Sequence, residues 1–403
     1  MEYSRRQFGK VALAGVPALA LFDNSLIGAA FAQAKPNSLI NGVQIGTITY
    51  SFRSMPDQTA EAILKYTVDS GISAIELMGG PVDEWMRRKG NYQPPSAANA
   101  AANAGGGRAA GGGGRAAGGG GAAGGGGRGR AAADPATLTA MWNGVACAPG
   151  RGGARGAAAA APAPAAAPAA PAEAAAGGGG RGGGRGPQTP EQIADAEYTR
   201  KWRQALPMQI LKDLKKMYND AGVTIYAVKN LGVNASDEEL EFQFAVAKEL
   251  GATHVTAELP TDAAALKRVG DAALKAKIFA AYHTHLQGNI TAFDQAFALS
   301  KGNMANVDLG HYVAAGGDPL AFLEKFHDKI SSFHLKDRTK PEHCELNLAW
   351  GTGETPIKEI LQMVKKNKWK MPASIELEYG VPQGSDAVTE VRKCVEYCRT
   401  ALA

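Results

Sequence analysis

Short β-prone runs that alternate with helical patterns are the feature of this chain that most constrains its fold. Eight such runs occur, at residues 43–52, 74–80, 223–229, 253–258, 278–285, 305–311, 330–337 and 372–380. Each is short and apolar and is followed by a segment of helical periodicity, as in a parallel β/α array. An open doubly wound sheet would call for a glycine-rich phosphate turn after an early strand, and the sequence has none. The pattern therefore predicts a closed (β/α)8 TIM barrel of the α/β class.

A long low-complexity tract interrupts this pattern between residues 95 and 187, where the composition falls to Ala, Gly, Pro and Arg. Such a tract has too little apolar bulk to offset the entropy of ordering it, so we expect a disordered insertion after the second strand. The barrel domain then comprises residues 40–94 and 188–403. The arginines of the tract account for the formal charge of +5, so the barrel itself carries no basic footprint for nucleic acid.

Residues 1–34 have the layout of an export signal. The segment SRRQFGK at 4–10 matches the twin-arginine pattern, and an apolar run and a small-residue site near residue 31 follow it. The apolar run is too short for a stable membrane span. We expect a twin-arginine signal peptide and a periplasmic or otherwise exported protein.

Metal-binding types of residue stand at the C-terminal ends of five predicted strands. They are Glu258, His283, His285, Asp308, His311, His334, Glu376 and Glu378. In a closed barrel these strand ends meet on one face, where enzymes of this architecture keep their chemistry. Side chains two apart on a strand point the same way, so one member of a pair can bind a metal while the other contacts substrate. Mixed imidazole and carboxylate ligands favour a divalent metal, namely Mn²⁺, Co²⁺, Zn²⁺ or Fe²⁺.

Four motifs resemble the xylose isomerase-like TIM barrels, a family of sugar phosphate isomerases and epimerases. They are YHTH at 282–285, DLGHYVAAGGDP at 308–319, FHLKDR at 333–338 and IELEYGVP at 375–382. The resemblance covers residues 42–402 apart from the insertion. Its epimerase branch binds one metal through Glu, Asp, His and Glu from strands five to eight, which implies Asp308, His334 and Glu376 as ligands here. Strand five departs from the pattern, because His283 stands where the epimerases have a carboxylate. The fourth ligand is then either His283 or Glu258.

The ligand set narrows the reaction. A divalent ion held by Asp308, His334 and Glu376 could chelate the carbonyl and neighbouring hydroxyl of a sugar or keto-sugar. Loss of the adjacent proton would give a metal-stabilised enediolate. Returning that proton isomerises or epimerises the sugar, whereas expelling a β-substituent makes the enzyme a lyase or dehydratase of a 3-keto-glycoside or inosose-type substrate. We expect an isomerase or epimerase, and export favours a substrate without phosphate.

Several neighbouring residues are candidates for the remaining catalytic roles. His285, His311 or Glu378 could take the proton as a general base. Lys336, two residues after a predicted ligand, could bind a hydroxyl, carboxylate or phosphate of the substrate. Residues 351–353, Gly-Thr-Gly, form either an anion cradle or a plain turn.

Two other classes of protein remain as distant alternatives. Endonuclease IV is a barrel relative, but it needs more histidine ligands and a basic groove, so we expect no nucleic-acid partner. In a non-catalytic binding protein, the arginine-rich tract would be the functional part. The oligomeric state is left open by the sequence, and a homo-oligomer is compatible with it.

Overall fold

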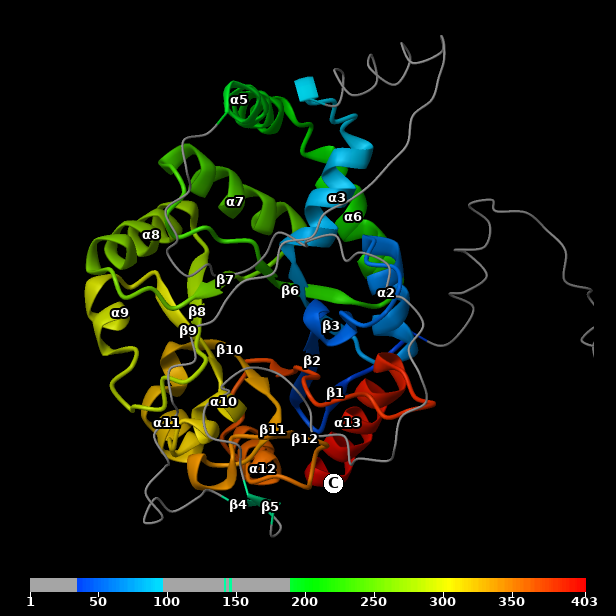
Figure 1. Cartoon of the computed structure of the whole chain (residues 1–403), viewed down its shortest axis with the longest axis vertical. Helices are drawn as coiled ribbons and strands as arrows, with labels where there is room; N and C mark the ends of the chain where they lie inside the picture. The colour runs from blue at the N-terminus through cyan, green and yellow to red at the C-terminus, as the bar shows by residue number, and fades with distance from the viewer. Residues whose placement is uncertain (1–34, 97–140, 143–144, 147–188) are drawn as a thin grey trace, which may run out of the picture. The chain divides into compact units, whose positions relative to one another are not determined.

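The barrel is closed by eight parallel strands (Figure 1). The computed structural model describes residues 35–96, 141–142, 145–146 and 189–403, and those from Pro36 onward belong to one compact unit. In chain order the barrel strands are β2 (Val43–Ile48), β3 (Ala74–Met78), β6 (Thr224–Lys229), β7 (His254–Glu258), β8 (Phe279–His283), β9 (Asn303–Asp308), β10 (Ile330–Leu335) and β13 (Ala373–Ile375). Hydrogen bonding runs through them in sequence order, and β13 pairs with β2 to close the ring. The predicted (β/α)8 barrel is confirmed.

Helices follow the strands and cover the outside of the barrel (Figure 1). They are α2 (Ala60–Asp69), α6 (Gln209–Asp220), α7 (Asp237–Leu250), α8 (Ala263–Ala276), α9 (Asp294–Leu299), α11 (Pro319–Phe326), α12 (Ile357–Asn367) and α13 (Ala387–Leu402). Their ends follow local chemistry. For example, the side chain of Ser236 accepts a hydrogen bond from the amide of Glu239 and so caps the start of α7. That helix ends at Gly251, whose φ of 86° is a left-handed conformation that glycine adopts without strain.

The described residues between β3 and β6 form three helices. Helix α3 (Gly79–Lys89) follows β3 directly, so it precedes residues 97–140, which lie outside the described part of the chain. After residue 188 the chain forms α5 (Pro190–Ala205) and then α6. Pro207 separates α5 from α6, because proline disfavours helical backbone at the residue before it, and Leu206 is indeed extended.

Small elements complete the fold. Strand β1 (Leu39–Ile40) pairs antiparallel with β2, and β11 (Asp337–Arg338) pairs with β12 (Asn347–Leu348). Within the predicted insertion, β4 (Met141–Trp142) and β5 (Val145–Ala146) form an antiparallel pair. Residues 97–140, 143–144 and 147–187 of that insertion and the predicted signal at 1–34 lie outside the described residues. Among the described helices, none is long and apolar enough to cross a membrane.

The interior of the barrel is polar, whereas the layer between strands and helices is apolar. Asn306 on β9 donates from its side-chain amide to both carboxylate oxygens of Glu76 on β3, at 3.3 Å each. These strands are not neighbours in the sheet, so the contact crosses the barrel. Below it, Ser332 donates to Asn306 over 3.0 Å and bonds His254 over 2.8 Å. Buried polar groups need partners, and this network provides them beneath the ends of the strands.

Candidate metal centre

Four buried side chains converge at the C-terminal ends of consecutive strands. His283 ends β8, Asp308 ends β9, His334 lies near the end of β10 and Glu376 directly follows β13. The register of the sheet pairs His334 with Asp308 across β9 and β10. Each of the four offers one ligand atom, and these atoms all lie within 4.8 Å of one another. The strand ends thus gather the predicted ligands around a common point.

The contacts within this group show how it could fit a cation. Nδ1 of His334 lies 2.7 Å from Oε2 of Glu376 and 3.9 Å from Oδ2 of Asp308. Nδ1 of His283 is fully buried and has no hydrogen-bond partner among the residues that the structure describes. A buried nitrogen without a partner is costly unless a ligand satisfies it. Two nitrogens and two carboxylates suit the borderline divalent metals, so the residues present fit such an ion.

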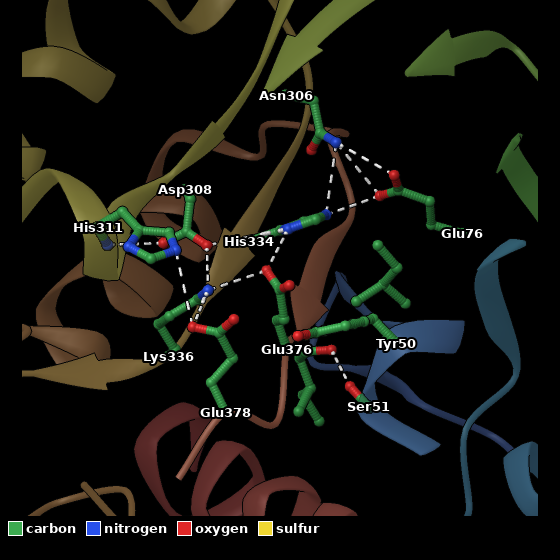
Figure 2. A network of polar contacts seen from close by, with 12 residues as sticks. Tyr50, Ser51, Glu76, Asn306, Asp308, His311, His334, Lys336, Glu376 and Glu378 are labelled. Carbon is green, nitrogen blue, oxygen red and sulfur yellow. Dashed lines mark hydrogen bonds and ion pairs between the residues drawn. The ribbon is translucent and has the colours of Figure 1, made fainter. Parts of the chain in front are cut away.

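Glu76 on β3 holds His334 from the other side, as Figure 2 shows. Nε2 of His334 lies 2.7 Å from Oε2 of Glu76, which accepts its proton. The hydroxyl of Thr256 donates to the other oxygen of Glu76 over 2.6 Å. With Nε2 committed to Glu76, Nδ1 is the atom that faces Asp308 and Glu376, as in the carboxylate–histidine–metal arrangement of many metal sites.

Charge explains the pKa values of this pair. Burial alone would raise the pKa of Glu76, but the ring of His334 lowers it to about 2. Burial would likewise lower the pKa of His334, but Glu76 and Glu376 raise it to about 10. Burial raises the pKa of Asp308 to about 6. A metal must therefore displace a proton from His334 when it binds.

The sequence interpretation did not include Glu76, although a signal was present. It is the one charged residue in the buried strand AIELM, and its side chain is fully buried. Carboxylates are almost never buried without a partner. The position of Glu76 was thus recognisable as special, but its partner, 258 residues further along the chain, was not.

Lys336 lies between three carboxylates. Its ammonium is 2.9 Å from Asp308, 3.1 Å from Glu376 and 2.8 Å from Glu378. The side chain is buried, and while burial would lower the pKa of Lys336, these carboxylates raise it. The sequence placed Lys336 and Glu378 among the catalytic candidates, and the structure brings both to the edge of the four-residue group (Figure 2). Lys336 offsets the negative charge there and fixes the carboxylate of Glu378.

Glu258, the alternative fourth ligand, is not among the four converging residues, although the register of β7 and β8 pairs it with His283. Its carboxylate is 3.0 Å from the ammonium of Lys229 and 3.0 Å from Nδ1 of His285. The geometry therefore favours His283 over Glu258 beside the other three. The hydrogen bond to Glu258 raises the pKa of His285 above its usual value. Nδ1 of His285 donates to Glu258, and Nε2 has no hydrogen-bond partner in the described part of the chain. A carboxylate on one imidazole nitrogen is an arrangement typical of a histidine general base.

His311 reaches the same region from a helix and not, as the sequence pattern predicted, from a strand. Strand β9 stops at Asp308, and α10 (Leu309–Ala314) begins there because Oδ1 of Asp308 accepts the amide proton of His311 over 2.7 Å. The ring of His311 lies 4.9 Å from that of His285, centroid to centroid. Burial and the nearby Lys336 lower the pKa of His311, so its ring is neutral.

The Gly-Thr-Gly turn at residues 351–353 is occupied by the protein's own carboxylate. The amides of Gly351, Thr352 and Gly353 donate to Oδ2 of Asp337 over 2.8, 3.1 and 2.9 Å. The amide of Thr355 donates to the second oxygen over 3.2 Å. The turn is therefore an anion cradle, as one of the two predicted alternatives had it, but the anion that it binds is the carboxylate of Asp337.

Known proteins resemble this chain only distantly in their overall sequence and structure. No curated protein matches the chain significantly. Among solved structures, a sugar phosphate isomerase/epimerase from Parabacteroides distasonis is 19% identical, with a TM-score of 0.40, over 48% of this chain and 76% of its own. A probable 3-DHS dehydratase from Bacillus anthracis is 11% identical, with a TM-score of 0.47, over 88% and 98%. An L-ribulose 3-epimerase is 12% identical, with a TM-score of 0.45, over 89% and 94%.

A protein-family comparison is more decisive than these distant likenesses. The family described as xylose isomerase-like TIM barrel matches residues 191–399, more than half of the chain. The matched segment contains six of the eight barrel strands and all four residues that converge at their ends. The chain belongs to the xylose isomerase-like TIM-barrel family.

Proposed function

We propose that this protein is a divalent-metal-dependent isomerase or epimerase of a sugar or keto-sugar. The observation that carries the proposal is the buried group of His283, Asp308, His334 and Glu376 at the catalytic end of the barrel. When bound there, a divalent ion would polarise a carbonyl and acidify the adjacent C–H. Relatives with isomerase and epimerase names support a reaction of this kind.

Residues around the four-residue group would carry out proton transfer and orient the substrate. His285 would move the proton, because its Nδ1 is held by Glu258 and its Nε2 makes no hydrogen bond with any described residue. Glu378, fixed by Lys336, would orient a hydroxyl of the substrate. These roles need no further charged group on the substrate.

The charges at the strand ends support a substrate without phosphate. Lys229 and Lys336 already pair with carboxylates. The loop after the seventh strand, a usual phosphate site in TIM barrels, is filled by Asp337. An uncharged sugar or keto-sugar fits these surroundings better than a sugar phosphate. Export also agrees with such a substrate and stays a prediction, because residues 1–34 lie outside the described part of the chain.

Elimination from a 3-keto-glycoside or inosose-type substrate is the second candidate, and one observation favours it. Strand β8 ends in His283 and so lacks the carboxylate that the epimerase branch would supply from strand five. Epimerisation returns the proton to the opposite face and needs a second acid, whereas elimination and isomerisation proceed with one base. The dyad of His285 and Glu258 provides one.

Proton exchange in D₂O tests the proposal. The metal-loaded protein is incubated with free keto-sugars and 3-keto-glycosides, and deuterium at the carbon beside the carbonyl is followed by NMR. We expect exchange that chelation abolishes, with an isomer or an elimination product appearing in the same spectra. The His285→Ala variant should lose exchange, while His327→Ala, at an exposed histidine outside the site, should retain it. Absence of deuterium in every substrate would contradict the proposal.

A further inference from the structure

The environment of His311 is unusual because a buried arginine contacts its ring. Nη1 of Arg338 is within hydrogen-bond distance of Nδ1 of His311. The second terminal nitrogen of Arg338 is bonded to the backbone carbonyl of Glu345. Only 8% of the surface of Arg338 is exposed, and 7% of that of His311. This contact is therefore shielded from solvent and has a fixed geometry.

The chemistry of the two groups determines where the proton of the imidazole lies. A guanidinium has N–H donors and no acceptor, so Nδ1 of His311 must accept from Arg338. A neutral imidazole that accepts at Nδ1 carries its proton at Nε2. Nε2 of His311 is buried and has no hydrogen-bond partner among the described residues, since Oε2 of Glu378 is 3.6 Å away. The Nε2–H of His311 is thus a hydrogen-bond donor without an acceptor among the described residues, and its ring lies beside that of His285.

We propose that Arg338 is a positioning residue that holds His311 in the Nε2–H tautomer, so that His311 donates a hydrogen bond to a substrate oxygen. This inference rests on the proposed function and gives His311 a specific part in it. The donor would stabilise negative charge that develops on an oxygen of an uncharged sugar as the neighbouring proton leaves. His311 is then neither the general base nor a nitrogen ligand for a second metal between His283 and His285.

A purely structural role for Arg338 is the competing explanation. Through the carbonyl of Glu345, Arg338 also secures the loop between β11 and β12. Loss of that role would lower the stability of the protein without changing the tautomer of His311. The position of the imidazole proton therefore separates the two explanations.

The tautomer can be measured without any substrate. The chain has seven histidines, and in the ¹⁵N-labelled protein the signals of His311 are identified by their absence in the His311→Gln variant. We expect Nδ1 of His311 to give the shift of an unprotonated nitrogen and Nε2 that of an N–H. Arg338→Met should move both shifts toward their average, while Arg399→Met, at an exposed arginine on α13, should leave them unchanged. A protonated Nδ1 in the wild type, or unchanged shifts in Arg338→Met, would overturn the inference.

Activity variants give a second readout once a substrate turns over. A glutamine amide can donate where the Nε2–H stood, so His311→Gln should retain kcat within about tenfold, while His311→Phe should lose roughly 10²–10³-fold. Arg338→Met should lower kcat more than it raises KM, and Arg338→Lys should recover part of the loss because an ammonium also donates to Nδ1. Equal losses in His311→Gln and His311→Phe would show that His311 acts as a base. If no sugar turns over, the proposed function fails, and the NMR experiment still decides the tautomer.

Discussion

Replacing Glu76 by Gln should weaken metal binding without touching any of the four predicted ligands. Each oxygen of Glu76 accepts from donors, with His334 at 2.7 Å on one and Thr256 at 2.6 Å on the other. A glutamine can still accept from His334 through its single oxygen, but it carries no charge. Hydrogen bonds that involve a charged group contribute about 1.5–3 kcal/mol, against roughly 0.5–1.5 kcal/mol for neutral ones. The loss of about 1–2 kcal/mol corresponds to an affinity that falls by about 5–30-fold, which overlaps the loss of about 10–100-fold typical for partners of metal-bound histidines.

The pH at which the affinity is measured decides how much of this loss is visible. In the metal-free wild type the pKa of His334 is raised to about 10, chiefly by Glu76 against the opposing effect of burial. At pH 7 a metal must displace that proton, and the variant, with a lower pKa of His334, has less to displace. The difference in affinity between wild type and Glu76→Gln should thus be larger at pH 9 than at pH 7, because less of the wild-type His334 is protonated at pH 9.

Titration calorimetry with Co²⁺ at both pH values measures these affinities, and circular dichroism verifies that the variant is folded. Thr256→Val serves as the matched control, because it removes one hydrogen bond from Glu76 and leaves the carboxylate on His334. We expect its affinity to stay much closer to that of the wild type. Equal affinities of wild type and Glu76→Gln at pH 9, or a gap that widens as the pH falls, would refute the reasoning.

Two further predictions concern the stability of the protein. Lys336→Met leaves Asp308 and Glu376 without their shared ammonium, so the free energy of unfolding of the metal-free protein in urea should fall by about 3–5 kcal/mol. Added metal should then stabilise this variant more than the wild type, because the ion replaces the ammonium between the two carboxylates. Equal stabilisation would argue against a shared role of Lys336 and the metal in offsetting the charge of Asp308 and Glu376. Burial lowers the pKa of His254 to about 4. As the pH falls, His254 therefore binds a proton in the unfolded chain, where its pKa is near 6.5, before it does so in the folded protein. Stability should therefore fall by up to about 3 kcal/mol as the pH drops from 6.5 to 4, and a His254→Gln variant with an unchanged pH slope would contradict this assignment.

The barrel could be predicted from the sequence because its signals are local. Each strand is a short apolar run and each helix has its own periodicity, so the alternation needs no knowledge of distant contacts. The convergence of Asp308, His334 and Glu376 also follows, since parallel strands present their carboxyl ends on one face. The sequence pattern was wrong where one segment suits both a strand and a helix. Residues 309–311 continue an apolar, β-prone run, but Asp308 caps the start of helix α10 there.

Contacts across the barrel interior could not be predicted in the same way. Glu76 meets His334, and Arg338 meets His311, only because the closed ring brings distant strands and α10 together. Gly310 shows how close this packing is: a Cβ there would lie 2.3 Å from Cγ of Lys336. A single sequence contains the residues of such contacts but not their pairing.

The central claim is that His283, Asp308, His334 and Glu376 share one divalent ion, and crystals grown with Zn²⁺ test it most directly. Anomalous scattering should show one strong peak about 2.0–2.2 Å from a nitrogen of each histidine and from an oxygen of each carboxylate. Nδ1 of His334 should then face the peak while Nε2 stays on Glu76. A peak elsewhere, or none between these side chains while His334 remains bonded to Glu376, would contradict the account.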